Sequence, residues 1–529
     1  MLSRVRREPK PILIFGALFV LVLTSAWTGP ARPGGDSATR RAPLPTRWIA
    51  GDGSPKPLHP APVYAGPLRM SEAVVRGAAV STPLVGVDGG AATRIAVVVE
   101  DSLYPSIQTR LQRLVGDLQA EGWTVLVNRF GSGKPQELRS YLRTRYGETK
   151  QGGLAGALFI GDVPYIVYEL MQTWDGTNYE YEDFPCDIFY MDVDGSWSDS
   201  KTNGSVQPGN GKYDTRSGDR GLEIWVGRLL TTNVSCLGTE AAVLNNYFEK
   251  NHLFRSGRLL TAPVALVYDD DDWDYMGTGD KANLKKIFSN AAEISGEEAT
   301  TASDYKNRRM PANLEFIYTR SHGWPGGHGY YRNGKADFES VYCGDYQTID
   351  PKALFYSFFV CSGCDYTAAD YLGGVAAFNK ESGLLAYGST KTGGIWDDEA
   401  FFNTLASGGS FGAAFVDWFN LVQAKYPSSA PPWWYGMVLI GDASLRPTVW
   451  ISGTVKTATG SALLGVTITF SDDGGKAVTD QNGFYRRPVF CGWSGTATPK
   501  KMGYSFNPGS RTYASVLSNK TGQNFKAVE

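Results

Sequence analysis

Two short motifs each place a reactive side chain directly after an apolar stretch. His322 and Gly323 follow the apolar residues 314–319, and Cys361 follows residues 354–360. Acyl transfer by a thiol needs a thiolate, a group that protonates the leaving amine, and N–H donors for the developing oxyanion. We predict Cys361 as the nucleophile and His322 as the acid/base partner. The backbone N–H groups of Gly323 and Cys361 are the candidate oxyanion donors.

A second chemistry is open at the same motifs. Cys364 lies three positions after Cys361, and His328 lies six positions after His322. A Cys-x-x-Cys pair can form a redox disulfide, and with two histidines it can bind zinc. We favour the Cys361–His322 pair, because apolar strands that run directly into both motifs suit the edge of an active site. Cys343 is expected to be structural or paired.

Acidic residues elsewhere suggest an ion site. Asp192, Asp194 and Asp199 surround a turn that contains Gly195, and alternate carboxylates on such a turn offer the oxygen ligands that calcium prefers. The glutamate that would complete an EF-hand is missing, so a solvated acidic turn is the alternative. The acidic run 269–272 is a second ion site, a subsite for basic side chains or an exposed loop.

The elements that would position these groups alternate between strands and helices. Apolar runs at 95–99, 123–127 and 155–160 are separated by helical spacing, and four later runs at 262–268, 314–319, 354–360 and 383–387 repeat the pattern. This alternation predicts an α/β fold with a mostly parallel sheet flanked by helices, in two sub-blocks at 94–260 and 261–448. Functional groups gather at the carboxyl ends of parallel strands, where His322 and Cys361 both fall.

The two ends of the chain differ from this α/β region. Residues 449–529 contain short alternating stretches broken by turns, which predicts a small all-β sandwich domain without a catalytic constellation. Residues 27–93 are rich in Pro and Gly and predict a linker or pro-segment, with Arg40–Arg41 as one place to cut.

The first 26 residues have the pattern of a secretory signal. Basic residues precede an apolar run at 12–23 that ends in small residues. An uncleaved membrane anchor is the alternative, although the run is shorter than the ~20 residues that span a bilayer. We therefore expect a secreted or cell-surface protein that meets a membrane only through this segment if it is uncleaved. A formal net charge of -2 gives no overall field for nucleic acid, and the sequence does not predict the oligomeric state.

Several motifs resemble the gingipain branch of the caspase-like cysteine peptidases. They are the two apolar strands that end in His322–Gly323 and Cys361, together with residues 161–164, 185–190, 223–229, 388–390 and 435–446. The similarity covers residues 94–447. It implies a caspase-like fold and a cysteine endopeptidase that acts on protein or peptide substrates, with no cofactor for catalysis. The last domain resembles the carboxypeptidase-regulatory-like β-sandwich modules.

The same resemblance implies further site residues. The loop after the strand at 383–387 would determine specificity, with Trp396 as a pocket wall and Asp397 or Asp398 as the partner of an Arg or Lys side chain. Calcium commonly stabilises enzymes of this kind, which favours a structural ion at Asp192 and its neighbours. A catalytically inactive peptidase-like protein that serves surface binding or adhesion is the alternative function.

Overall fold

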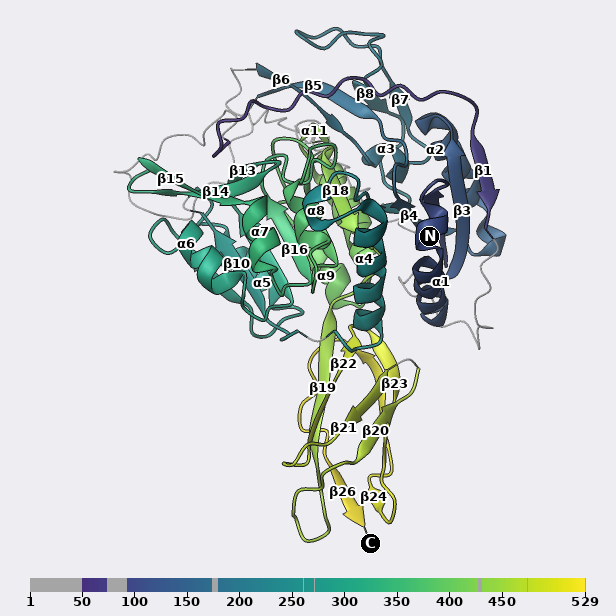
Figure 1. Cartoon of the computed structure of the whole chain (residues 1–529), viewed down its shortest axis with the longest axis vertical. Coiled ribbons are helices and arrows are strands. Elements are labelled where there is room, and N and C mark those ends of the chain that lie inside the picture. The colour runs from purple at the N-terminus through teal and green to yellow at the C-terminus, as the bar shows by residue number, and fades with distance from the viewer. Residues whose placement is uncertain are drawn as a thin grey trace, which may run out of the picture. The chain divides into compact units, whose positions relative to one another are not determined.

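The computed structural model describes residues 50–73, 93–173, 179–259, 261–270, 272–426, 431–472 and 474–528 (Figure 1). Its largest feature is one eleven-stranded sheet. In spatial order the strands are β1 (Arg69–Glu72), β3 (Thr124–Ser132), β2 (Arg94–Glu100), β4 (Leu154–Ile160), β9 (Trp225–Leu229), β18 (Met437–Gly441), β17 (Leu385–Ser389), β16 (Phe355–Phe359), β12 (Phe316–Arg320), β10 (Ala265–Asp269) and β11 (Ala292–Ser295).

The sheet joins the two predicted sub-blocks through β18. This strand pairs with β9 of the first sub-block and is antiparallel to β17 of the second. All five residues of β18 are buried, as expected for an apolar strand covered on both faces. Beyond the ends of β4 and β9 the chain meets the loop that follows Cys361, because the Tyr165 ring centroid is 5.8 Å from that of Tyr366 and Asn233 Nδ2 donates to the Tyr366 carbonyl at 2.9 Å. The carboxyl ends of the two sub-blocks therefore lie at one edge of the sheet. The α/β prediction is confirmed, with one continuous sheet.

Helices flank the sheet. They are α1 (Tyr104–Ala120), α2 (Pro135–Gly147), α3 (Ile188–Met191), α4 (Glu240–Arg255), α5 (Gly277–Leu284), α6 (Ala302–Asp304), α7 (Cys343–Ile349), α8 (Leu372–Ala377), α9 (Glu399–Ala406), α10 (Phe411–Lys425) and α11 (Pro431–Trp434). The longest, α1, has a proline in its first turn and buries apolar residues at helical spacing from Ile107 to Leu118. It packs against α4, and α9 packs against α10. Short turns η1 (Thr149–Gln151), η2 (Ser235–Leu237) and η3 (Tyr305–Arg309) complete the set.

Small antiparallel sheets extend the edge where the second sub-block ends. The strands β13 (His322–Trp324), β14 (Gly327–Arg332) and β15 (Asp337–Tyr342) form a meander directly after β12. The hairpin of β5 (Val167–Thr173) and β6 (Tyr179–Pro185) leaves the first sub-block and reaches the same edge, where Thr390 Oγ1 donates to the Pro185 carbonyl at 2.7 Å. A short pair, β7 (Ser196–Ser198) with β8 (Thr215–Ser217), follows in the chain.

The C-terminal β-domain (residues 448–528) has a hydrophobic core of its own, formed between two four-stranded sheets. One sheet has the order β22 (Phe484–Phe490), β19 (Thr448–Lys456), β26 (Phe525–Val528), β24 (Ser505–Asn507), and the other the order β21 (Gly475–Val478), β20 (Thr467–Phe470), β23 (Trp493–Lys500), β25 (Arg511–Val516). The buried carboxylate of Glu315 accepts hydrogen bonds from the Thr448 N–H at 2.7 Å and from its hydroxyl at 2.8 Å. These bonds join the β-domain to the start of β12.

Residues 50–73, which the sequence predicts to be part of a linker, form a strap against the folded domain (purple in Figure 1). β1 pairs with β3, and His59 in the middle of the strap is buried. Composition misses this order because a few charged contacts and one strand pairing hold the strap, rather than an apolar core of its own. The predicted signal at 1–26 lies outside the described residues. None of the described helices is long and apolar enough to span a bilayer.

Candidate active site

His322 and Cys361 end neighbouring parallel strands in the same register. Arg320 of β12 lies opposite Phe359 of β16, so both reactive residues follow two positions later. Trp273 packs between His322 and Phe359, with its ring centroid 4.8 Å from that of His322 and 5.4 Å from that of Phe359. The parallel sheet therefore brings the predicted pair to one edge, as the carboxyl-end rule requires.

The His322 ring is held by a carboxylate that sequence reasoning did not single out. Its Nε2 lies 2.7 Å from Oδ2 of Asp272, which also pairs with Lys335. Burial alone would raise the pKa of Asp272, but the hydrogen bonds from His322 and Lys335 hold it below the ordinary value. The hydrogen bond to Asp272 fixes the orientation of the imidazole. The only signal in the sequence was the acidic run itself, at the end of a strand.

His328 and Cys364 occupy structural positions. His328 is fully buried between the Ser321 hydroxyl at 3.2 Å and the Tyr346 hydroxyl at 3.1 Å, and burial lowers its pKa to about 3. The Cys364 thiol packs against Gly373 and Gly388, where an added β-carbon would lie within 3 Å of the sulfur. Among the described residues, the one group with metal-ligand spacing contains none of these side chains. The zinc alternative has no support in this geometry.

The half-buried Cys361 sits at a strained turn. Ser362, the next residue, has a φ of +52°, which is uncommon for a residue with a side chain, and its N–H donates to the Lys391 carbonyl. Burial raises the pKa of the Cys361 thiol, while a hydrogen bond from the Gly393 N–H and the nearby Lys391 and Lys56 ammonium groups lower it. This arrangement favours a protonated thiol as long as the site stays covered.

Gly323 is required for packing beside the nucleophile. A β-carbon at this position would lie 2.3 Å from Cγ1 of Val360 and 2.7 Å from the Gly327 carbonyl oxygen. The glycine therefore lets the strand that carries His322 approach the strand that carries Cys361. The oxyanion role of the Gly323 and Cys361 N–H groups stays a prediction.

The strap runs along this edge and contacts residues of the meander after His322 as well as Glu182, which neighbours the loop around Gly393. Gly51 packs on Trp324 and Ser340 of the meander after His322. Further along, Lys56 Nζ lies 2.5 Å from Oε1 of Glu182, and Glu182 Oε1 accepts a hydrogen bond from the Thr392 N–H, one residue before Gly393.

His59 fixes the middle of the strap. Its ring bridges Asp183 at 3.1 Å and Asp365 at 2.9 Å, and its backbone N–H donates to Asp183. Burial lowers the pKa of His59, but the hydrogen bonds to the two carboxylates more than offset this and raise the pKa to about 9. The imidazolium is therefore paired with two buried acids at neutral pH. The sequence offered no context for this histidine.

The predicted specificity loop begins beside Cys361 and then turns away. Trp396 stacks on Trp434 and Tyr426, and Asp397 pairs with Lys425 at 2.6 Å. Asp398 is buried and accepts hydrogen bonds from Asn283 and Tyr318. Both acids are thus committed to internal partners. The buried acid that lies beside the nucleophile is Glu182 of β6, which also pairs with Lys391 at 3.1 Å.

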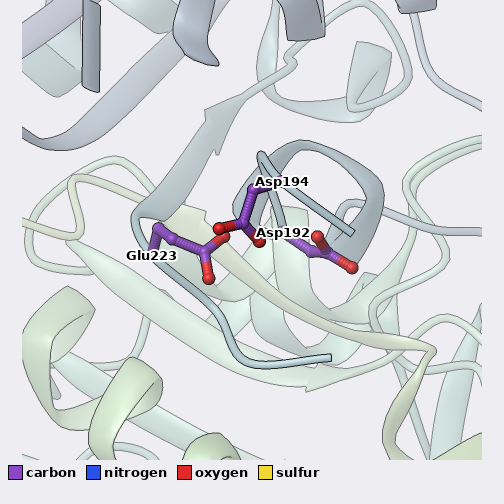
Figure 2. A group of neighbouring side chains, drawn as sticks. All are labelled: Asp192, Asp194 and Glu223. Atoms are coloured by element: carbon purple, nitrogen blue, oxygen red, sulfur yellow. The ribbon is translucent and has the colours of Figure 1, made fainter. Parts of the chain in front are cut away.

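The acidic turn brings together a different set of carboxyl groups from the predicted Asp192, Asp194 and Asp199. The carboxyl groups that come within ligand distance belong to Asp192, Asp194 and Glu223, and Figure 2 shows those of Asp194 and Glu223 turned toward one another. Asp192 is saturated by Arg139, Arg216, Trp197 and the Gly195 N–H. Asp199 instead accepts the N–H groups of Gly209 and Gly211.

The pKa of Glu223 is affected by the other carboxyl groups around it. Burial and the neighbouring Asp194, Asp192 and Asp219 raise its pKa to about 7, although a hydrogen bond from the Val193 N–H acts in the opposite direction. Crowded carboxylates of this kind favour either a proton or a cation between them. Asp194 and Glu223 are therefore the residues of this group that could hold a cation.

The site thus holds a thiol and an imidazole at adjacent strand ends, with a carboxylate behind the imidazole, which are the groups that thiol-dependent acyl transfer requires. The sequence matches the profile of Peptidase family C25 over residues 122–448, more than half of the chain. This protein belongs to peptidase family C25, the gingipain family.

Solved structures of this family align with most of the chain. The Arg-specific cysteine proteinase gingipain R (RgpB) is 13% identical with a TM-score of 0.46, and the alignment covers 85% of this chain and 100% of that one. A complex of Porphyromonas gingivalis RgpB pro- and mature domains is 12% identical with a TM-score of 0.46, covering 82% of this chain and 100% of that one. No curated protein matches the sequence.

Proposed function

We propose that this chain is an exported endopeptidase that uses a Cys361–His322 dyad on protein or peptide substrates. The observation that carries the proposal is the shared register of the two residues at adjacent parallel strands, with Asp272 behind the imidazole. Export is supported by the basic and apolar pattern of the first 26 residues.

In this mechanism the Cys361 thiol gives its proton to His322, and the resulting thiolate attacks the scissile carbonyl carbon. The oxyanion accepts hydrogen bonds from the Gly323 and Cys361 N–H groups. The tetrahedral intermediate collapses as protonated His322 gives its proton to the departing amine. Water then attacks the thioester while His322 takes a proton from it. The C–S bond breaks, the carboxylic acid leaves, and His322 returns the proton to the Cys361 sulfur. Asp272 is a positioning residue that orients the imidazole through its hydrogen bond to Nε2.

The substrate preference in this proposal is a basic side chain at P1. Glu182 replaces Asp397 and Asp398 as the acid that would receive it, because Glu182 is close enough to Cys361 to influence its pKa. In the strapped chain the ammonium group of Lys56 already occupies this position at 2.5 Å. A Lys or Arg side chain of a substrate would make the same charge-assisted contact.

The strap supports a latent form of the enzyme. Because it pairs with Glu182, Asp183 and Asp365 and packs on the meander after His322, a substrate would compete with it for the same edge. We therefore expect activity to require displacement or removal of the strap.

The test is cleavage of a mixed peptide library by five matched proteins. Wild type is compared with Cys361→Ala, with Cys236→Ala as a control thiol outside the site, and with the strap variant Lys56→Glu/His59→Asn. We expect cleavage after Lys or Arg that is lost in Cys361→Ala, kept in Cys236→Ala and increased in the strap variant. Val63→Ala controls for substitution in the strap, because Val63 is exposed. Cleavage that survives in Cys361→Ala would refute the dyad, and an unchanged rate in the strap variant would refute latency.

A further inference from the structure

The end of the β-domain remote from Thr448 carries an unusual surface, which we call the distal end. The strand registers define it. β19 runs from Thr448 to Lys456, and the residues opposite its far part belong to the start of β22 and to β26. On the second sheet the same end holds Thr467, Val478 and Lys500, which lie side by side across β20, β21 and β23.

Exposed apolar side chains gather at this end. The described part of the β-domain has seven large hydrophobic residues in exposed positions, and six of them lie at the distal end. They are Leu464, Val478, Phe484, Met502, Tyr504 and Val528. The seventh, Leu517, lies at the other end, where its carbonyl faces Cys491. Met502 is 97% exposed, Val478 60% and Leu464 58%, so these side chains project into solvent and cover no core.

The same end is cationic. Lys456 and Lys526 are neighbours across β19 and β26, Lys500 ends β23, and Lys501 donates to the Leu464 carbonyl at 2.8 Å. Asp480 is the acidic residue of the described distal turns, and it caps its own turn through the Asn482 and Phe484 N–H groups. Residues 448–529 as a whole have a formal net charge of +5, whereas the entire chain has -2.

Apolar tips surrounded by lysines match the chemistry of an anionic bilayer. Isolated apolar side chains on turns can enter the headgroup region, while lysines gain about 1 kcal/mol each near an anionic surface. A second copy of the chain fits poorly, since two cationic ends would repel each other. An ordinary surface would also not concentrate its exposed apolar residues at one end.

We propose that the distal end of the β-domain docks the protein on an anionic lipid surface. Met502 and Leu464 insert, and Lys456, Lys500, Lys501 and Lys526 contact the headgroups. The β-domain then acts as a membrane-targeting module that holds the peptidase at an envelope. This role is independent of the predicted N-terminal signal and of the catalytic dyad.

The test is co-sedimentation with vesicles of phosphatidylcholine alone or with added phosphatidylglycerol. It uses the chain without residues 1–26, so that the apolar N-terminal run does not bind the lipid. We expect binding to the anionic vesicles that falls about tenfold in Met502→Asp/Leu464→Asp and about fivefold in Lys500→Gln. Leu517→Asp and Lys520→Gln are matched controls away from the distal end, and they should bind as the parent does.

Three outcomes would overturn the proposal. They are no binding to anionic vesicles, equal binding by the distal variants and the controls, or equal binding to neutral and anionic vesicles. Sedimentation velocity without lipid distinguishes lipid docking from self-association. A dimer that is lost in Met502→Asp would assign the surface to self-association. Peptide cleavage in solution should be unchanged in every variant, so failure here is distinguishable from failure of the proposed peptidase.

Discussion

Replacing His59 with glutamine should remove a pH-dependent part of the attachment of the strap. In the folded protein the pKa of His59 is raised from 6.5 to about 9. This difference corresponds to about 3 kcal/mol. A raised pKa means that the folded state binds the proton more tightly. The stabilisation is therefore complete below pH 6.5 and is lost as the pH rises through 9. Glutamine keeps a polar side chain between Asp183 and Asp365 but cannot titrate.

The assay is amide hydrogen exchange of residues 50–73, which reports the free energy of opening the strap. In a Cys361→Ala background that prevents self-cleavage, the opening free energy of the parent should fall by up to about 3 kcal/mol between pH 6 and pH 9.5, and that of His59→Gln should stay nearly constant. His252→Gln is the control, because His252 pairs with the half-buried Asp117 between α4 and α1. The same pH dependence in His59→Gln and the parent would refute the reasoning.

Two further predictions concern other carboxyl groups. Burial raises the pKa of Glu315 to about 7 despite its hydrogen bonds from Thr448, so ionisation costs stability as the pH rises from 4.5 to about 7. Glu315→Gln should be more stable than the parent at pH 8 by up to about 3 kcal/mol and lose this advantage at pH 4.5, as measured by urea unfolding; equal stability at both pH values would contradict this. Calcium should raise the thermal unfolding midpoint, an effect that Asp194→Asn removes and Asp199→Asn keeps, because Asp199 is engaged by Gly209 and Gly211. A shift that both variants retain would place any ion elsewhere.

The parts of the site that sequence reasoning found depend on local pattern. His322 and Cys361 each end an apolar run, and parallel strands bring such ends together without any knowledge of the loops. The choice of His322 over His328 followed the same rule. The α/β class and the all-β domain also follow from periodicity, which is a property of neighbouring residues.

The parts that were missed depend on contacts between distant segments. Glu182 lies near Cys361 only because the hairpin of β5 and β6 extends from the first sub-block to the active edge. The residues around position 182 contain no pattern that predicts this arrangement. Asp272 was one of four adjacent acids, and only tertiary structure distinguishes it by placing His322 2.7 Å away. His59 lies in a Pro- and Gly-rich segment whose order comes from Asp183 and Asp365.

The position of β18 in the sheet and in the chain affects how the protein folds during synthesis. This strand is the central one of eleven, yet it is the last of them in the chain. Until residue 441 has left the ribosome, β9 and β17 are open edges without their native neighbour, and the two halves of the sheet cannot join. Its pairings with β9 and β17 also close long loops, which makes sheet completion slow relative to local folding. A chain that crosses a membrane before β18 is paired would travel with its sheet still in two halves, and the site would be completed only at its destination.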